Sequence, residues 1–380
     1  MNHHLLNTAL LNKNELFLDR KNLRPLNFSL VGCGAITQLY YAPLLARLSS
    51  SIVAKGVYVF DPDPRQVDKV TAIIGDVRVC KTIEELVASD PDAAIVASPP
   101  KFHACQTIAL LQKRIAVLCE KPMCSTVEEA REMMHTADQH RALLSVGLFR
   151  RFFPVSQTLR NIIENNSLGQ PLEFIVYEGG PFQWPAQSAS FFQKSNSHGG
   201  VLADLGAHVL DLLLWWFGDV SELQYSDDSM GGLESNCEIQ MQFANGVHGT
   251  VKLSRDIALR NCTVVRFEGG TVRFAAGESS KLILQFSGSK TSLTASVQGE
   301  LQGSHYPTAS WSYHQSFAAQ MLHFISAVHR IHPPLVSGLD GVKSMEIIDK
   351  CYKSRKLMRL PWFDNIEQLR GEQLSKQGAT

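Results

Sequence analysis

An acidic residue and a histidine stand one helical turn apart in residues 199–218, an otherwise apolar stretch that reads GGVLADLGAHVLDLLLWWFG. Asp204, His208 and Asp211 are spaced i, i+4 and i+7, and at roughly 100° per residue they fall within about 60° of one another on a helix. Because an unpaired carboxylate or imidazole is costly to bury, this polar stripe is expected to face either a polar network in the core or a functional cleft. In a cleft, the acid and the imidazole would suit a general base held in one tautomer.

Lys121 is a second candidate, in the segment Cys119-Glu120-Lys121-Pro122 that directly follows the apolar residues 115–119. The carboxyl ends of parallel strands open onto the crevice in which such sheets bind ligands. An ammonium there would lower the pKa of a neighbouring substrate hydroxyl; the alternative is a solvated surface lysine. Farther on, LFRRFFP (148–154) carries Arg150 and Arg151, which either reach an anionic or polyhydroxylated ligand or pin a domain junction.

Short apolar strands alternate with helical segments through the first half of the chain, which predicts a parallel sheet with helices on both faces. The helices are expected from about residue 35 to 48, after Pro62 and Pro64, and over 101–113 and 125–140. The expected strands are 27–31, 53–60, 77–80, 93–97, 115–119 and 143–146.

A glycine motif, Gly32-Cys33-Gly34, follows the first strand and opens the first helix, as in a dinucleotide-binding fold. Gly32 allows the tight turn, and Gly34 lets a pyrophosphate approach backbone N–H groups at the helix N-terminus. The third glycine of the fingerprint is replaced by Thr37. Asp61, at the end of the second strand, is placed to accept hydrogen bonds from a ribose and to repel a 2′-phosphate, which favours NAD over NADP. The alternative for Asp61 is a helix N-cap ahead of Pro62.

The second half has a different pattern, in which apolar and polar residues alternate between turn signals. This predicts an open, largely antiparallel sheet with one covered face, and helices at 313–331 and 341–356. The uncovered face favours a homo-oligomer. The loop 179–197, which contains Trp184, carries aromatic residues suited to stacking on a sugar ring, or to a domain core. The expected strands are 172–177, 223–225, 238–243, 248–253, 262–267, 271–274 and 281–286.

Composition excludes several classes of protein. The chain of 380 residues has 36 basic and 36 acidic residues, so its overall charge indicates no nucleic-acid or membrane partner. No apolar run approaches the roughly 20 residues of a membrane helix. Eight scattered cysteines without a CxxC pair predict reduced thiols in a cytoplasmic protein and no metal site. We divide the chain into an N-terminal extension (1–26), a dinucleotide-binding domain (27–150), a substrate-binding and oligomerisation domain (151–360) and a peripheral tail (361–380).

Together these segments resemble the Gfo/Idh/MocA family of oxidoreductases, named for glucose–fructose oxidoreductase, inositol dehydrogenase and a rhizopine-catabolism protein. The resemblance covers about residues 27–360, and the EKP segment followed some eighty residues later by D-x-G-x-H is its most specific part. Thr37, and Tyr41 where many members carry histidine, depart from the family pattern. The matching pieces are LVGCGAIT, VFDPDP, ASPPKFH, CEKPM, FRRFFP, GGVLADLGAHVLDLLLWWFG and PPLVSGLDGVKSMEIIDKCYKS.

The resemblance implies a Rossmann domain and an α/β domain with an open sheet, with NAD or NADP in the cleft between them. It implies a catalytic set of Lys121, Asp204 and His208. Taking the residues and the resemblance together, we expect cofactor binding by Gly32, Gly34, Ala35, Ile36, Asp61, Ser98, Pro99, His103, Glu120 and Lys121, and substrate binding by Arg151, Trp184, Asp204 and His208.

We therefore expect an NAD-dependent dehydrogenase of a sugar, cyclitol or sugar derivative. His208 would take the proton of a ring hydroxyl, Lys121 would stabilise the charge that develops on its oxygen, and Asp204 would orient substrate and support the imidazolium. Asp211 is expected to hold the helix. The alternatives are a redox-neutral NAD-dependent enzyme that cleaves glycosides or performs an elimination, and a non-enzymatic dinucleotide or sugar sensor.

Overall fold

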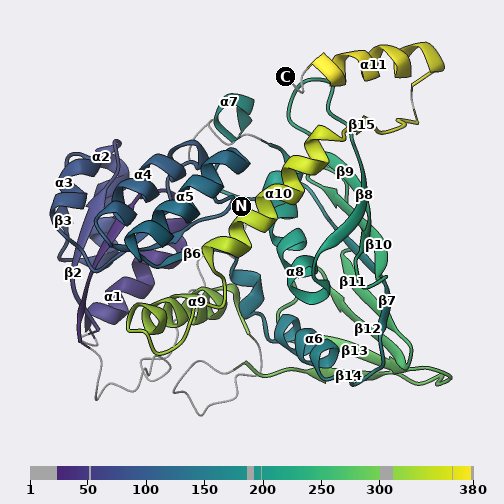
Figure 1. Cartoon of the computed structure of the whole chain (residues 1–380), viewed down its shortest axis with the longest axis horizontal. Helices are drawn as coiled ribbons and strands as arrows, with labels where there is room; N and C mark the ends of the chain where they lie inside the picture. The colour runs from purple at the N-terminus through teal and green to yellow at the C-terminus, as the bar shows by residue number, and fades with distance from the viewer. Residues whose placement is uncertain are drawn as a thin grey trace.

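Two β-sheets lie side by side in the chain, with helices packed on and between them (Figure 1). The computed structural model describes residues 24–50, 53–185, 192–197, 199–299, 311–361 and 363–377. Most of the expected N-terminal extension and part of the aromatic loop 179–197 therefore lie outside the described residues. None of the helices in the described ranges is both long and apolar enough to cross a bilayer.

The first sheet is parallel throughout, in the order β3-β2-β1-β4-β5-β6. Val31 at the end of β1 pairs with the last residues of both β2 and β4. The same alignment continues through the ends of β5 and β6. The residues that follow these strands, among them Gly32, Asp61 and Glu120, therefore lie along one edge. The strands are β1 (Leu26–Val31), β2 (Ala54–Phe60), β3 (Arg78–Val79), β4 (Ala93–Val96), β5 (Ala116–Cys119) and β6 (Leu144–Val146).

Helices α2, α3 and α5 of this domain begin at residues whose side chains cap them. The side chain of Asp63 caps α2 by accepting from Arg65 N, and Thr126 forms a capping box with Glu129 at the start of α5. The first helix begins at Ala35 and passes through a π-helical turn, η2, before it becomes α1. The helices are η2 (Thr37–Tyr41), α1 (Ala42–Ser50), α2 (Pro64–Ile74), α3 (Ile83–Ala88), α4 (Pro100–Gln112) and α5 (Val127–His140).

The second sheet has the order β14-β13-β12-β11-β7-β10-β9-β8-β15. It is mostly antiparallel, as the alternating pattern predicts, with parallel pairs at β7–β10 and β8–β15. The sequence did not predict β14 and β15. The strands are β7 (Pro171–Gly179), β8 (Val220–Asp227), β9 (Asn236–Phe243), β10 (His248–Ser254), β11 (Cys262–Phe267), β12 (Gly270–Ala275), β13 (Lys281–Phe286), β14 (Leu293–Ser296) and β15 (Lys356–Leu357).

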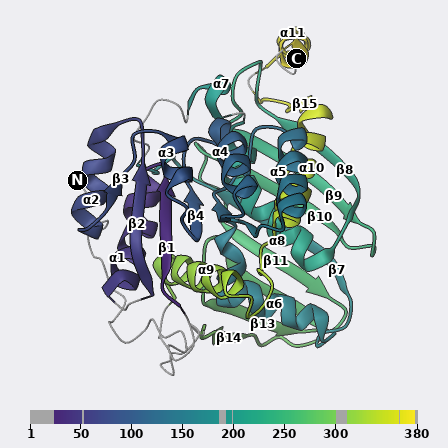
Figure 2. The same ribbon diagram turned by 60° about the vertical axis from the view of Figure 1, so that its left-hand side comes forward.

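Helices α6 and α8 lie against one face of this sheet, and the opposite face carries no helix in the views of Figures 1 and 2. The apolar helix α8 is buried as predicted: Trp216 and Phe217 pack on Phe174, Phe243 and Phe274 from the strands. The remaining helices are η3 (Phe149–Phe152), α6 (Pro154–Glu164), α7 (Lys194–Ser197), η5 (Leu202–Gly206), α8 (Ala207–Phe217), α9 (Tyr313–Val328), α10 (Gly338–Lys353) and α11 (Asn365–Gln377).

The late helices α9 and α10 contact both halves of the chain, so the expected boundary near residue 150 separates the sheets but not the helices (Figure 2). Helix α10 lies between α5 and α8. Ser145 Oγ in β6 donates to the carbonyl of Val336 at 2.6 Å, just before α10. In α9, Gln320 Nε2 donates to the hydroxyl of Tyr41 at 3.1 Å. The expected tail forms α11, which projects from the end of the second sheet (Figure 1).

Candidate active site

The structure brings Lys121 and Asp204 together from the two domains. Lys121 follows β5, and its Nζ lies 2.6 Å from Asp204 Oδ1 and 3.3 Å from the Asp204 carbonyl oxygen. The two side chains keep 19% and 23% of their surface exposed, so a ligand can reach them. The predicted lysine at a strand end and the predicted carboxylate on the apolar helix thus share one site.

The helix that carries Asp204 begins with a π-helical turn, η5, which the sequence did not predict. The carboxylate of Glu234 accepts hydrogen bonds from Gly200 N at 2.9 Å and Leu202 N at 3.0 Å, and so satisfies orphan donors at the start of this helix. A π turn has more residues per turn than an α-helix. Asp204 is therefore rotated away from the narrow stripe that an ideal α-helix predicts for Asp204, His208 and Asp211.

Both carboxylate oxygens of Asp204 contact cations. Oδ1 faces Lys121, and Oδ2 lies 3.0 Å from a guanidinium nitrogen of Arg255. Burial alone would raise the pKa of Asp204, but Lys121 and Arg255 outweigh burial and lower that pKa. We expected this carboxylate to support the imidazolium of His208; it instead holds Lys121 and Arg255.

His208 lies one turn farther along, buried to 5% exposure, with its ring edge-to-face on Phe149 at a centroid distance of 5.0 Å. Its Nδ1 is buried and has no hydrogen-bond partner among the described residues. Burial lowers the pKa of His208 well below 6.5, and the positive charges of Lys121 and Arg150 lower it further. The imidazole is therefore neutral at neutral pH and able to accept a proton.

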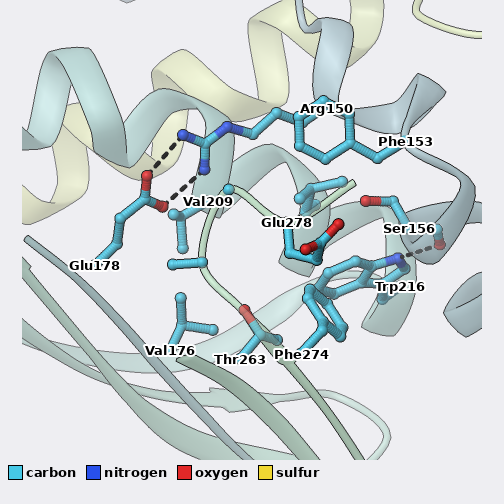
Figure 3. A pocket seen from close by; sticks show the side chains of 13 residues that line it. Arg150, Phe153, Ser156, Val176, Glu178, Val209, Trp216, Thr263, Phe274 and Glu278 are labelled. Atoms are coloured by element: carbon cyan, nitrogen blue, oxygen red, sulfur yellow. Dashed lines mark hydrogen bonds and ion pairs between the residues drawn. The ribbon is translucent and has the colours of Figure 1, made fainter. Parts of the chain in front are cut away.

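Arg150 is fixed by a double hydrogen bond to Glu178 at the end of β7, with both N–O distances 2.7 Å (Figure 3). The cavity beside this pair lies behind α8 and has a volume of about 20 Å³. Trp216 Nε1 donates to the carbonyl of Ser156 at 3.1 Å in its wall. A space of that size accommodates about one water molecule, so it is part of the core and not a substrate site.

Arg151 occupies the domain junction, which is the second of its two expected roles. Its guanidinium is bonded to Asp211, with an NH2–Oδ1 distance of 2.6 Å, and to Asp340 at 2.9 Å. Arg151 is 3% exposed, and its guanidinium is held by two carboxylates. Both observations argue against the expected contact of Arg151 with substrate. Burial raises the pKa of Asp211 to about 6, because its effect outweighs the opposing effect of the Arg151 charge. Asp211 holds the helix, as expected.

The glycine loop has the shape that a pyrophosphate needs. Gly32 has φ +94°, and a Cβ there would lie 2.5 Å from the backbone nitrogen of Ser98, so no other residue fits. A Cβ on Gly34 would meet no protein atom within 4 Å, which leaves space open before the helix N-terminus. Thr37, in place of the third glycine, donates through Oγ1 to the carbonyl of Gly32 at 2.7 Å and so fastens the turn. Ala35 and Ile36, which lie between Gly34 and Thr37, form the start of the helix.

Asp61 faces this loop from the end of β2. Its carboxylate accepts from Cys33 N and from Asp63 N, each at 2.8 Å. The side chain that caps α2 belongs to Asp63. Asp61 therefore does not take the alternative role of N-cap. A carboxylate has about four lone-pair sites, and two remain for ribose hydroxyls.

His103 and Glu120 lie beneath the lysine segment. The ring nitrogens of His103, which is 1% exposed, lie 2.7 Å from the Ser98 carbonyl and 2.9 Å from the Pro122 carbonyl. Glu120 is 6% exposed and accepts from Tyr41 Oη at 2.5 Å and from Lys121 N at 3.0 Å. These contacts support the segment that carries Lys121, and contact of His103 and Glu120 with the cofactor stays a prediction. Ser98 and Pro99 form the turn into α4.

Sequence reasoning missed a pocket of about 450 Å³, one of whose lining residues, Arg255, pairs with Asp204. Its walls include Arg255, which comes directly after β10; a basic residue at that strand end was the available signal. Trp184 stands near the start of the adjacent loop with 37% of its surface exposed, and its contact with substrate stays a prediction. The pocket is lined by Phe182, Phe192, Lys194, Gly232, Leu233, Glu234, Ser235 and Arg255, and we call it the Arg255 pocket.

Comparison with known proteins agrees with this architecture. The model of the Gfo/Idh/MocA oxidoreductase family, NAD-binding Rossmann fold, matches residues 26–148, and that of the GFO/IDH/MocA C-terminal domain matches residues 156–273. The rhizopine catabolism protein MocA of Rhizobium meliloti is 28% identical over 191 residues, which are 50% of this chain and 56% of that protein. Inositol 2-dehydrogenase 4 of Saccharopolyspora erythraea is 24% identical over 335 residues, 85% of this chain and 89% of that protein.

Among solved structures, levoglucosan dehydrogenase in complex with NADH and levoglucosan is similar in fold, with a TM-score of 0.78. Its sequence is 20% identical, and the alignment covers 87% of this chain and 97% of that one. The similarity extends over both sheets.

Proposed function

Because the chain belongs to the Gfo/Idh/MocA family of oxidoreductases, we propose that it is an NAD-dependent dehydrogenase of a ring carbinol in a sugar, cyclitol or sugar derivative. The observation that carries this proposal is a donor, Lys121, close enough to an acceptor, His208, for the charge of the lysine to lower the pKa of the histidine. Lys121 has three N–H donors, of which two are directed to Asp204 oxygens, and His208 Nδ1 is a buried nitrogen with no partner among the described residues. An alcohol needs this combination, because its oxygen accepts one hydrogen bond while its O–H donates another.

Bound nicotinamide supplies the hydride acceptor for oxidation. His208, kept neutral by burial and by two nearby cations, takes the proton of the carbinol O–H. Lys121 donates to the same oxygen and stabilises the negative charge that develops there. Asp204 holds the Lys121 ammonium in position and orients the substrate. In the reverse direction the same groups return the proton to a ketone.

The residues around the glycine loop fit the dinucleotide. The open space at Gly34 and the turn enforced at Gly32 accept a pyrophosphate against backbone N–H groups. Asp61 is directed at the same loop and keeps acceptor sites for the adenosine ribose. Its charge favours NAD over NADP, since a 2′-phosphate would meet a carboxylate.

The names of the relatives support a polyol substrate. One curated relative is an inositol 2-dehydrogenase, and one structurally similar protein was solved with NADH and levoglucosan. Both names describe enzymes that act on a hydroxyl of a cyclic polyol. We extend that substrate class to this chain.

A screen of sugars and cyclitols with NAD, followed by the absorbance of the reduced nicotinamide, tests the proposal. We expect turnover with at least one cyclic polyol, and a decrease in kcat of roughly 10²- to 10⁴-fold in His208→Asn with NADH binding nearly unchanged. His248→Asn, at an exposed position in β10, is the control and should keep full activity. Normal turnover in His208→Asn would show that the base is wrongly assigned.

The same screen separates the two alternative functions. A redox-neutral enzyme would retain tightly bound cofactor through purification and convert its substrate with no net NADH release. A sensor would bind dinucleotide or sugar without turning either over. Neither alternative has a structural observation in its favour.

We further propose that the protein is a cytoplasmic homo-oligomer. All eight cysteines are free thiols, which is typical of a reducing compartment. The face of the second sheet that carries no helix (Figure 1) is available to a second copy. Light scattering coupled to size-exclusion chromatography measures the mass of the protein in solution. A mass equal to that of one chain would refute the homo-oligomer.

A further inference from the structure

We propose that Tyr41 is a positioning residue for the reaction, which acts through the carboxylate of Glu120 to fix the peptide unit that carries Lys121. This inference rests on the proposed function and adds a residue to the site built around Lys121 and Asp204. Tyr41 is one of the two residues at which the sequence departs from the family pattern. The contacts of its hydroxyl group give that departure a physical role.

The hydroxyl of Tyr41 belongs to a buried chain of hydrogen bonds that ends at Lys121. Tyr41 Oη donates to Glu120 Oε1 at 2.5 Å, and the second carboxylate oxygen, Oε2, accepts from Lys121 N at 3.0 Å. Tyr41 is 0% exposed and Glu120 is 6% exposed. Gln320 Nε2 in α9 donates to Tyr41 Oη at 3.1 Å, so the phenol oxygen accepts one hydrogen bond while its O–H donates another.

Gly147, which directly follows β6, also fixes the carboxylate of Glu120. A Cβ at this glycine would lie 2.8 Å from Glu120 Oε1 and 3.0 Å from Oε2, so a larger residue would displace the carboxylate. The backbone keeps the two residues side by side, because Gly147 N donates to the carbonyl of Cys119 at 2.7 Å. The carboxylate therefore has a defined place between Gly147 and the hydroxyl of Tyr41.

Lys121 is thereby held at both ends of its side chain. Its backbone nitrogen is bonded to Glu120, and its Nζ lies 2.6 Å from Asp204 Oδ1 in the second domain. A lysine side chain is flexible over four carbons, so the position of the ammonium depends on both anchors. Burial raises the pKa of Glu120, and the hydrogen bond from Tyr41 opposes that rise. Tyr41 therefore favours the charged carboxylate, which is the stronger acceptor.

Helix α9 connects this chain of hydrogen bonds to His208 as well. Phe317, one turn before Gln320, packs edge-to-face on Tyr41 at a centroid distance of 5.6 Å. Phe317 also stacks on Phe149 at 4.4 Å, and Phe149 packs edge-to-face on His208 at 5.0 Å. One helix therefore supports both the lysine and the histidine of the proposed mechanism.

Tyr41→Phe tests this role, because it removes the hydroxyl and leaves the ring in place. D-glucose, myo-inositol and levoglucosan are assayed with NAD, and the fastest of them serves for all variants. We expect kcat to fall by about 10- to 100-fold, with KM and the dissociation constant of NADH changed by no more than about twofold. Tyr225→Phe is the matched control, since its hydroxyl donates to the buried carboxylate of Asp227 at 2.6 Å. It should lower the melting temperature by a similar amount and keep full kcat.

A double-mutant cycle assigns the effect to Glu120. Glu120→Ala should lower kcat at least as much as Tyr41→Phe does, and Tyr41→Phe added to Glu120→Ala should have no further effect. Gly147→Ala displaces the carboxylate without altering Tyr41. It should lower kcat in the wild type but not in the Glu120→Ala background, where the added methyl group has room.

The environment of Lys121 is also measured without turnover. Reductive methylation with isotopically labelled formaldehyde marks lysine amino groups for NMR, and Lys121→Arg identifies the Lys121 signal. Tyr41→Phe should shift this signal, whereas Tyr225→Phe should leave it in place.

Full kcat in Tyr41→Phe would overturn the inference, as would independent losses in the cycle or an unshifted Lys121 signal. If no polyol is oxidised at all, the proposed function fails. The NMR comparison of Tyr41→Phe with Tyr225→Phe then still decides whether Tyr41 positions Lys121.

Discussion

Replacing Asp61 with asparagine should narrow the proposed preference of the enzyme for NAD over NADP. The carboxylate accepts two backbone N–H bonds at 2.8 Å and faces the glycine loop. A hydrogen bond to a charged acceptor contributes about 1.5–3 kcal/mol and a neutral one about 0.5–1.5 kcal/mol, so the ribose contact should weaken by about 1–1.5 kcal/mol. Removing a negative charge about 6 Å from a phosphate relieves about 1–3 kcal/mol of repulsion at the dielectric of a partly exposed site.

Together these effects reduce the preference by about 2–4 kcal/mol, or roughly 30- to 1,000-fold in the ratio of dissociation constants. Fluorescence titration with NADH and NADPH measures both constants, and low ionic strength should enlarge the repulsive part. Asp63→Asn is the matched control, because that carboxylate caps α2 and pairs with Arg65. An Asp61→Asn ratio equal to that of the wild type would refute the assignment of Asp61 as the selector.

Three further outcomes are expected. Burial, and then two nearby cations, lower the pKa of His208, so kcat/KM should stay constant as the pH falls to 6.5 and decline only below it, as a pH–rate profile would show. Arg151→Met leaves the buried carboxylate of Asp211, which is 1% exposed, without its main partner. It should lower the free energy of unfolding by about 3–5 kcal/mol in urea denaturation. The double variant Arg151→Met with Asp211→Leu should recover part of that lost stability. Gly32→Ala, at φ +94°, should lower the melting temperature, whereas Gly34→Ala should weaken NADH binding with little change in that temperature.

The pattern of apolar residues was sufficient to predict the parallel sheet, because its central strands are short apolar runs buried on both faces. In β4 and β5 every residue is buried, and a continuous apolar run is the pattern that such strands leave in a sequence. The edge strands β14 and β15 were missed for the opposite reason. All four residues of β14 are exposed, and β15 has two residues, so neither carries a hydrophobic alternation that distinguishes it from a loop.

The local arrangement of the site followed from the sequence only in part. Spacing located Asp204 and His208 on one helix, but the angle between them depends on η5, and η5 depends on Glu234, which is distant in sequence. Arg255 was not predicted because its role depends on which strand lies beside β7. The parallel β7–β10 pair aligns Ser254 with Gly179, a long-range register that no local pattern encodes.

The segment that leaves the first sheet fixes the relative positions of the proposed catalytic residues. Three consecutive side chains of η3 contact two elements of the second domain. Phe149 packs on His208 and Arg151 pairs with Asp211, both on α8, and Arg150 pairs with Glu178 on β7. Because η3 follows β6 within the same edge of the sheet as Lys121, helix α8 is anchored to the strand ends that carry the lysine. An arginine pair that interrupts an apolar exit segment therefore has a geometric purpose in the proposed mechanism. The proton acceptor on helix α8 and the ammonium just after β5 come from separate domains and must meet at one carbinol oxygen.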